Sequence, residues 1–125
     1  MKLILAMIRI AKMNETKVAL SEAGLPSFTA MPILGRGAGR AIGPNIQATK
    51  NHPDMVAENE VLSTPRLKSK RMITLVVSDD KKDLAVETII KVNQTGNSGD
   101  GKIIVVDALE SVRVRTGESG DSTLD

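Results

Sequence analysis

The chain has 125 residues, of which 41% are apolar and 26% charged, as expected for one globular domain over residues 1–125. It has no cysteine, which excludes disulfides and thiolate chemistry and fits a reducing compartment such as the cytoplasm. The single histidine, His52, argues against a catalytic triad or a metal site, and we interpret it as a solvated loop residue. With one phenylalanine and no tyrosine or tryptophan, the chain offers nucleobases almost no stacking surface.

Residues 1–34 predict a strand, a helix and a second strand. Residues 2–9 form an apolar run typical of a central strand, too short and too charged to cross a membrane. Asn14 is a candidate N-cap for a helix that ends at Gly24. Residues 27–34 predict another strand, and Pro32 favours a place at the sheet edge because proline lacks a backbone donor.

Residues 36–71 predict a long loop, because glycine and proline recur there without a helical or strand period. Loops of this length are uncommon in compact domains and usually carry function. Seven basic residues against three acidic ones give the segment a net charge of +4, so the basic character of the chain lies in its loop.

The second half repeats the order of the first. Residues 72–77 predict a buried strand, and Ser78, Asp79 and Asp80 are candidate caps of a helix that ends near residues 95–96. Residues 103–106 predict a further strand, and 117–125 a polar, mobile tail. Two such halves predict an α+β fold, a ferredoxin-like βαββαβ sheet with both helices on one face.

The turn at residues 95–102, TGNSGDGK, is the first candidate binding element. Glycines let successive amide N–H groups point into one concavity, as in phosphate cradles, and Lys102 adds a positive charge. The alternative is a plain turn between a helix and a strand. The segment is not a Walker motif, because Ile103 opens a strand where that motif requires a helix.

Two further patterns have a functional and a structural interpretation. On a strand, Arg113 and Arg115 would share one face about 7 Å apart and suit a polyphosphate, or else they pair with Glu110 or Glu118. The three alternate glycines of residues 35–40 would allow close approach to a ligand, or serve as a hinge. The Asp79-Asp80 pair is interpreted as helix capping rather than acid-base machinery.

Taken together, these motifs resemble the PII nitrogen signal-transduction proteins. The resemblance rests on TGNSGDGK at residues 95–102, VRVRTGE at 112–118, MKLILAMIRI at 1–10 and GRG at 35–37, and covers everything but the long loop. It implies a trimer with ATP or ADP in clefts between subunits. It also implies a T-loop, here residues 36–71, that contacts target proteins, and 2-oxoglutarate bound beside MgATP at the loop base.

The resemblance also implies roles for individual residues. Phosphate contacts would come from Gly99, Asp100, Gly101, Lys102, Arg113 and Arg115, and the adenine surroundings from Thr29, Gly35 and Val76. Gly37 would also belong to the nucleotide site. Gly37 and Lys70 would hold 2-oxoglutarate. Two positions depart from the family pattern: Ala38 replaces a phosphate-binding arginine, and Gly39 replaces a glutamine that helps to coordinate magnesium and 2-oxoglutarate.

The loop is longer than the common T-loop and has no tyrosine for uridylylation. With GLPSFTA at residues 24–30 and VNQTG at 92–96, the chain is similar to the nitrogenase-associated branch, and to its longer paralogue. That branch implies assembly as a homotrimer or with a paralogue, and inhibition of nitrogenase when ammonium appears and 2-oxoglutarate falls.

Three alternatives stay open at this point. Within the family, the target could be an ammonium transporter, although the unusual loop argues against it. A nucleotide-hydrolysing enzyme would need a general base, and Asp100 is the one candidate near the turn. Nucleic-acid binding through the basic loop is weakly supported. We therefore predict a regulator that is not an enzyme, holds no metal site of its own, spans no membrane and binds no nucleic acid.

Overall fold

The computed structural model describes residues 1–37 and 66–124. The chain divides into two units, residues 1–33 with 70–125 and residues 34–69. His52, Ala38, Gly39 and most of the predicted loop lie outside the described residues.

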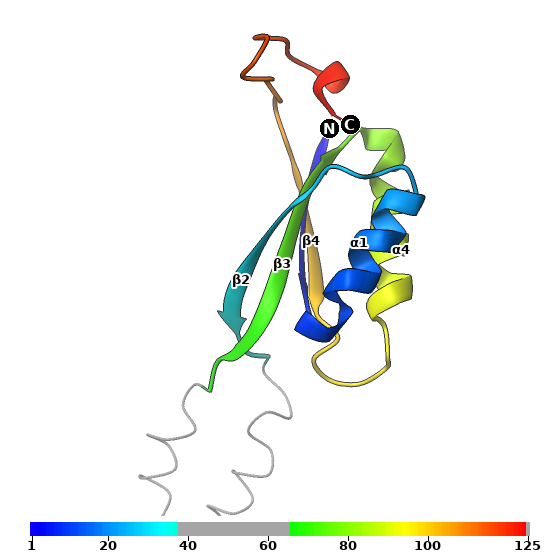
Figure 1. Cartoon of the computed structure of the whole chain (residues 1–125), viewed down its shortest axis with the longest axis vertical. Helices are drawn as coiled ribbons and strands as arrows, with labels where there is room; N and C mark the ends of the chain where they lie inside the picture. Colours follow the sequence, from blue (N-terminus) through cyan, green and yellow to red (C-terminus); the bar gives the residue numbers. More distant parts are fainter. Residues whose placement is uncertain (38–65, 125) are drawn as a thin grey trace, which may run out of the picture. The chain divides into compact units, whose positions relative to one another are not determined.

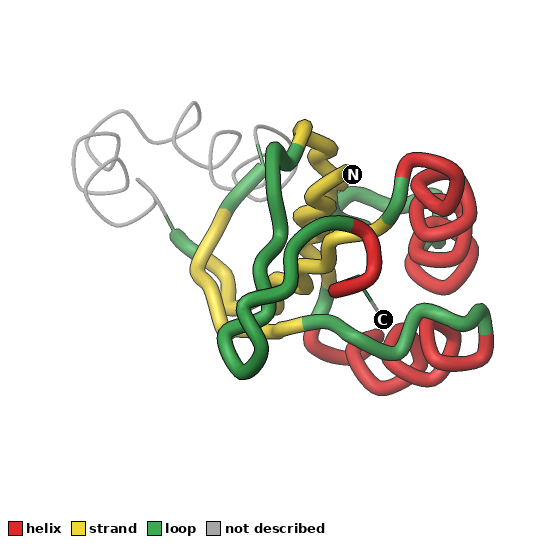
Figure 2. The backbone as a smooth tube through the Cα atoms, turned by 90° about the horizontal axis from the view of Figure 1, so that it is seen from above, coloured by secondary structure: helices red, strands yellow, loops and turns green. Residues whose placement is uncertain are grey.

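The larger unit contains a four-stranded sheet with two helices on one of its faces (Figures 1 and 2). The strands lie in the order β2-β3-β1-β4, and β1 runs antiparallel to both of its neighbours. This arrangement confirms the ferredoxin-like βαββαβ fold, with β1 central and β2 at an edge as Pro32 indicated. The elements are β1 (Lys2–Ile8), α1 (Met13–Glu22), β2 (Thr29–Gly35), β3 (Lys68–Val77), α4 (Lys82–Asn93) and β4 (Lys102–Asp107), with short 3-10 helices at Ile10–Lys12, Asp79–Lys81 and Asp121–Thr123.

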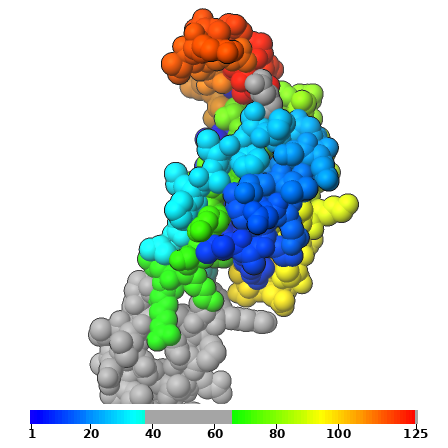
Figure 3. All heavy atoms as spheres, in the orientation of Figure 1, coloured from blue at the N-terminus to red at the C-terminus, as the bar shows by residue number. Residues whose placement is uncertain are grey.

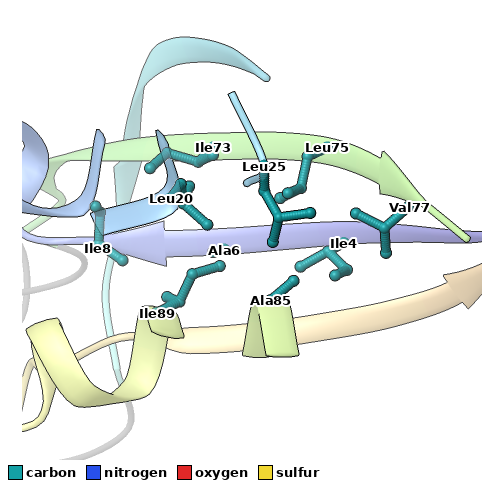
Figure 4. Close-up of a cluster of buried hydrophobic side chains, with 10 residues drawn as sticks. All are labelled: Ile4, Ala6, Ile8, Leu20, Leu25, Ile73, Leu75, Val77, Ala85 and Ile89. Atoms are coloured by element: carbon teal, nitrogen blue, oxygen red, sulfur yellow. The ribbon is translucent and has the colours of Figure 1, made fainter. Parts of the chain in front are cut away.

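The core lies between the sheet and the two helices (Figure 4). Alternate residues of β1 and β3 point into it because successive side chains of a strand face opposite sides. The fully buried residues include Ile4, Ile73, Leu20 and Ile89. The apolar run at residues 2–9 therefore buries one side completely and leaves the other side half-buried.

The end of α1 matches the prediction and its start does not. Gly24 adopts φ of +82°, and the Leu25 amide donates to the Leu20 carbonyl at 2.8 Å, a glycine-capped helix end. The N-cap is Lys12 rather than Asn14, because a 3-10 turn at Ile10–Lys12 leads directly into the helix.

The start of α4 also differs from the prediction. Ser78 precedes a 3-10 helix at Asp79–Lys81, and its side chain makes no capping hydrogen bond. The Asp79 carboxylate instead lies 3.0 Å from the amino group of Met1. The carboxylates of Asp79 and Asp80 still lie in the first turn of this 3-10 helix, where the helix dipole favours negative charge.

The predicted loop is shorter at its C-terminal end than residues 36–71, because β3 begins at Lys68 and not at Met72. The four residues 68–71 are therefore strand. Lys70 consequently sits on a strand of the sheet, where its side-chain direction is set by the alternation of β3.

The face of the sheet away from the helices is apolar and largely open. Leu5 pairs with Thr74 on one side and with Ile104 on the other, and Ile104 is 41% exposed. Further members of this open face are Leu3, Met7, Met72, Val76 and Val106. A sheet that leaves such a face uncovered usually buries it against another element or another chain.

Within the described residues, none of the helices has the length and apolar character that crossing a membrane requires.

Candidate functional site

The glycine turn, residues 95–101, joins α4 to β4 and is folded around one carboxylate. Asp100 Oδ2 accepts hydrogen bonds from the amides of Thr95 at 2.8 Å and Gly96 at 2.9 Å. Its Oδ1 accepts the Thr95 hydroxyl at 2.5 Å, and the amide of Asn97 donates to that hydroxyl at 3.2 Å. The first three amides of the turn are thus directed toward its own side chains.

The next four amides of the glycine turn are directed elsewhere. The N–H groups of Ser98, Gly99, Asp100 and Gly101 have no acceptor anywhere in the described part of the chain. Consecutive unpaired amides form a concavity with positive potential, which is the geometry that binds phosphate and other anions. Lys102 follows them at the start of β4 and is exposed.

The backbone conformation of the turn requires glycine. Gly96, Gly99 and Gly101 have φ of +85°, +96° and +116°, a region that other residues rarely adopt. At Gly101 a Cβ atom would also lie 2.0 Å from the carbonyl oxygen of Met7. The glycines predicted to let the backbone form a cradle are therefore needed for the turn itself.

Asp100 is held in its ionised form. Hydrogen bonds from Thr95 and then from Arg9 lower the pKa of its carboxyl below the ordinary value of 3.8, and the amides of Thr95 and Gly96 add to the effect. An ionised carboxylate with its lone pairs occupied is a poor general base. This observation weakens the hydrolase alternative, which had Asp100 as its candidate base.

Arg9 contacts the turn and was missed by the sequence analysis. Its Nη1 lies 2.6 Å from Asp100 Oδ1, and its Nη2 donates to the Ser98 carbonyl at 2.9 Å. Ninety-one positions separate Arg9 from Asp100, so no local pattern could indicate the contact.

Lys70, predicted as an effector ligand, lies beside the turn. Its Nζ donates to the Gly99 carbonyl at 3.1 Å. Lys70 belongs to β3 and shares the helix-free side of the sheet with Met72 and Thr74. The structure therefore brings Lys70 together with the glycine turn and Lys102 at one end of the sheet.

Thr29 and Val76 lie on the sheet itself. The hydroxyl of Thr29 is hydrogen-bonded to that of Thr74 across β2 and β3. Val76 pairs with Leu3 on the helix-free side and is half-buried. Thr29 and Val76, two of the three residues predicted to surround the adenine, are thus on the open apolar face, and the third, Gly35, ends β2.

Arg113 and Arg115 occupy a turn, so their predicted strand is wrong. The Gly117 amide donates to the Arg113 carbonyl at 2.7 Å, and Val112 bridges to Ser119, which closes residues 112–119 into a tight reversal. The two guanidinium groups therefore do not follow the period of a strand. The sequence pattern failed because the alternation of valine and arginine covers only four residues.

The two arginines differ in their surroundings. Arg113 pairs with Glu118 at 3.2 Å and donates to the Ser122 carbonyl at 3.1 Å, so the alternative pairing with Glu118 is correct for this residue. Arg115 is exposed and makes no ion pair or hydrogen bond with the described residues. Of the two, Arg115 is the one available to an anion.

The arginines lie far from the glycine turn. The turn enters β4 at Lys102, and the strand ends at Asp107 about 17 Å further along, at the usual rise per residue. Ala108 then bonds to the carbonyl of Met1, at the end of the sheet where β1 begins (Figure 1). One copy of the chain therefore holds its two predicted phosphate-binding groups at opposite ends of the sheet.

The segment after β4 folds on itself at that far end (Figure 3). The hydroxyls of Thr123 and Ser111 lie 2.7 Å apart, and the Gly120 amide donates to the Ser111 carbonyl at 3.0 Å. Leu109 and Val114 are each 98% exposed. The mobility of residues 117–125 stays a prediction.

Gly35 and Gly37 belong to the smaller unit, where Gly35 ends β2 and Gly37 follows it. Neither has a positive φ, and a Cβ atom at either position would meet nothing within 4 Å. Their backbone conformations therefore do not require glycine in this structure. Their predicted ligand contacts stay predictions.

A pocket of about 490 Å³ lies between α4 and β4, next to the turn. Ile8, Val86, Ile90 and Ile103 are among the residues that line it. Asp100, Gly101 and Lys102 of the turn border the same pocket, so it is apolar on one side and polar where it meets the glycine turn. Among residues 1–37 and 66–124, no group of three or more histidine, aspartate or glutamate side chains is placed to hold a metal ion.

Comparison with known proteins gives consistent matches. Residues 1–118 match the family model described as nitrogen regulatory protein P-II. The nitrogen fixation nifHD region GlnB-like protein 2 of Methanothermobacter marburgensis is 42% identical over 124 residues, which is 99% of this chain and 100% of that protein. The protein of the same name from Methanobacterium ivanovii is 44% identical over 99% of both chains. Nitrogen regulatory protein P-II 1 of Escherichia coli (strain K12) is 37% identical over 99% of this chain and 100% of its own length.

Proposed function

This chain belongs to the nitrogen regulatory protein P-II family, and we propose that it binds ATP or ADP between copies of itself to control a target protein. The family and the names of the relatives are those of regulators, so the prediction that the chain is not an enzyme is confirmed at the level of the family. The names also connect the relatives with nitrogen regulation and nitrogen fixation.

One observation carries the proposal: a single copy has an amide cradle at one end of its sheet and an exposed arginine at the other. The cradle with Lys102 suits one side of a polyphosphate, and Arg115 suits the other. Both groups can contact one nucleotide only if they come from different copies. The open apolar face, with Ile104 and Val106 each about 40% exposed, supports an assembly of copies.

The assembly we propose is a trimer, alone or mixed with a paralogue. In it the amides of residues 98–101 and Lys102 of one copy would hold the phosphates, with Arg115 from a neighbour, whose Arg113 stays paired with Glu118 in the same turn. Thr29 and Val76, on the helix-free side, would border the base.

The effector site would lie beside the same turn. Lys70 offers a cation for a carboxylate such as that of 2-oxoglutarate, and its ammonium group now contacts Gly99. A bound carboxylate would compete with Gly99 for Lys70, which connects effector binding to β3 and so to the C-terminal end of the loop.

The target we propose is a component of nitrogenase. Support comes from the names of two relatives, both called nitrogen fixation nifHD region GlnB-like protein 2. The loop between β2 and β3, residues 36–67, would dock on that target in one ligand state only. The protein would work in the reducing cytoplasm, which fits a chain that has no cysteine.

Calorimetric titration with MgATP, followed by a mixing experiment, tests the site. We expect about one nucleotide per chain for the natural protein and strongly weakened binding for Lys102→Ala and for Arg115→Ala. When the two variants are unfolded together and refolded as mixed oligomers, some sites pair an intact Lys102 with an intact Arg115. Binding should therefore return in part, and no return would contradict a site shared between copies.

The target is tested separately by co-sedimentation with purified nitrogenase components under ADP, MgATP, or MgATP with 2-oxoglutarate. Effector-dependent release is expected, and Lys70→Ala should abolish that dependence. Retention by membranes containing an ammonium transporter, with no retention by nitrogenase, would support the alternative target.

A further inference from the structure

The glycine turn is fastened to the end of β1 by a single guanidinium group. Arg9 follows the last residue of β1, and its side chain is 29% exposed. Nη1 contacts Asp100 at 2.6 Å and Nη2 donates to the Ser98 carbonyl at 2.9 Å. A Cβ atom on Gly99 would lie 3.3 Å from Nη2, so the turn closes tightly over this group.

The direction of the Ser98 carbonyl decides the direction of the next amide. In a planar trans peptide, the C=O of one residue and the N–H of the following residue point to opposite sides. Because Arg9 holds the Ser98 carbonyl toward itself, the N–H of Gly99 must point away from the guanidinium. Lys70 acts in the same way on the Gly99 carbonyl and so on the N–H of Asp100.

Asp100 presents a difficulty that the same guanidinium resolves. A carboxylate beside a phosphate cradle would repel an incoming anion. Asp100 accepts bonds from Thr95, Gly96 and Arg9, which place cationic and amide donors around it. The planar fork of arginine can contact the carboxylate and the Ser98 carbonyl simultaneously, and the point charge of lysine cannot reproduce that geometry.

We propose that Arg9 is a positioning residue of the nucleotide site: it contacts the turn and not the phosphates, and it orients the unpaired amides that bind them. This inference rests on the proposed function. It adds a residue from the far end of the sequence, whose role is to preform the cradle before any ligand arrives.

The test compares Arg9→Ala, Arg9→Lys and a matched charge control, Lys12→Ala, in the full-length protein. Lys12 is as exposed as Arg9, at 29%, and pairs with Glu15 at 3.7 Å, away from the turn. MgATP affinity is measured by calorimetry, and amide hydrogen exchange of residues 98–101 is measured by NMR without ligand. Circular dichroism and sedimentation confirm that each variant is folded and assembled.

We expect at least a tenfold loss of MgATP affinity for Arg9→Ala, a smaller loss for Arg9→Lys and little change for Lys12→Ala. We also expect turn amides that exchange several times faster in ligand-free Arg9→Ala, which the loss of a phosphate contact alone would not produce. Unchanged affinity in Arg9→Ala, or an equal loss in Lys12→Ala, would overturn the positioning role alone. Absence of MgATP binding by the natural protein would overturn the proposed function and this inference with it.

Discussion

At the scale of single residues, Asp100 organises the turn and need not contact a ligand itself. Its carboxylate accepts the hydroxyl and amide of Thr95, the amide of Gly96 and the guanidinium of Arg9. The family resemblance had implied a phosphate contact at this position. A backbone contact through its N–H remains compatible with that expectation, because this amide has no acceptor among the described residues.

Replacing Asp100 by asparagine should destabilise the protein in a pH-dependent way. The pKa of this carboxyl is lowered on folding, so its contribution to stability is complete above about pH 4 and is lost as the pH falls through the lower folded value. The natural protein should therefore be clearly more stable than Asp100→Asn at pH 7, and the two should converge in acid. Urea titrations at several pH values measure this, and a difference that grows in acid would contradict it.

Gly101 should not tolerate even alanine. Its φ of +116° is unfavourable for any side chain, and a Cβ atom would meet the Met7 carbonyl at 2.0 Å. Gly117→Ala is the matched control, since Gly117 has φ of +75° and open space around it. We expect Gly101→Ala to cost about 2 kcal/mol more than the control in the free energy of unfolding. Equal effects in thermal denaturation at one protein concentration would disprove the steric argument.

At the scale of elements, the helices α1 and α4 contact each other through a buried polar pair. Between α1 and α4, Asn93 donates to the Thr16 hydroxyl at 3.0 Å, and both residues are buried. The Thr16 hydroxyl in turn donates to the Lys12 carbonyl at 2.7 Å. The Asn93 amide group also donates to the Ile89 carbonyl at 2.9 Å, so both donors are satisfied, while its buried Oδ1 has no partner among the described residues.

Two neighbouring isoleucines of α4 should respond very differently to truncation. Ile89 is 1% exposed and packs in the core, whereas Ile90 is 43% exposed. Ile89→Ala should lower the free energy of unfolding by about 3 kcal/mol, because it leaves a cavity, and Ile90→Ala by less than about 1 kcal/mol. Chemical denaturation of both variants tests this, and similar losses would mean that the helix is packed differently.

At the scale of the whole molecule, the helix-free face of the sheet determines what a single copy can do. Leu5 and Ile104 lie side by side on it, and the two candidate phosphate-binding groups lie at its opposite ends. A second copy placed against this face would cover apolar surface and could bring its own Arg115 toward the first copy's Lys102.

Introducing a charge on this face should prevent assembly and leave the subunit folded. Ile104→Lys is expected to reduce the trimer to smaller species, because burying an ammonium group in an apolar interface is costly. Val18→Lys, on the outer side of α1 and 55% exposed, is the control and should assemble normally. Analytical ultracentrifugation measures the state, and loss of MgATP binding in Ile104→Lys alone would connect assembly to the site.

Much of the fold could be predicted from the sequence because its signals are local. The apolar run of β1, the glycine that ends α1 and the proline of β2 each act through the conformation of neighbouring residues. The glycine turn was recognised for the same reason. The expected caps at Asn14 and Ser78 and the expected strand at the arginine pair are absent, since short 3-10 turns and a tight reversal take their place.

The sequence by itself determined the family, the order of elements and the turn that suits an anion, because these depend on residues close together in the chain. Only the tertiary structure decided how the site is built. It joined Arg9 to Asp100 across ninety-one positions, brought Lys70 to Gly99, and separated Arg115 from Lys102 by the length of a strand. Such contacts follow from how β1, β3 and β4 pair, and strand pairing is a property of the folded chain as a whole.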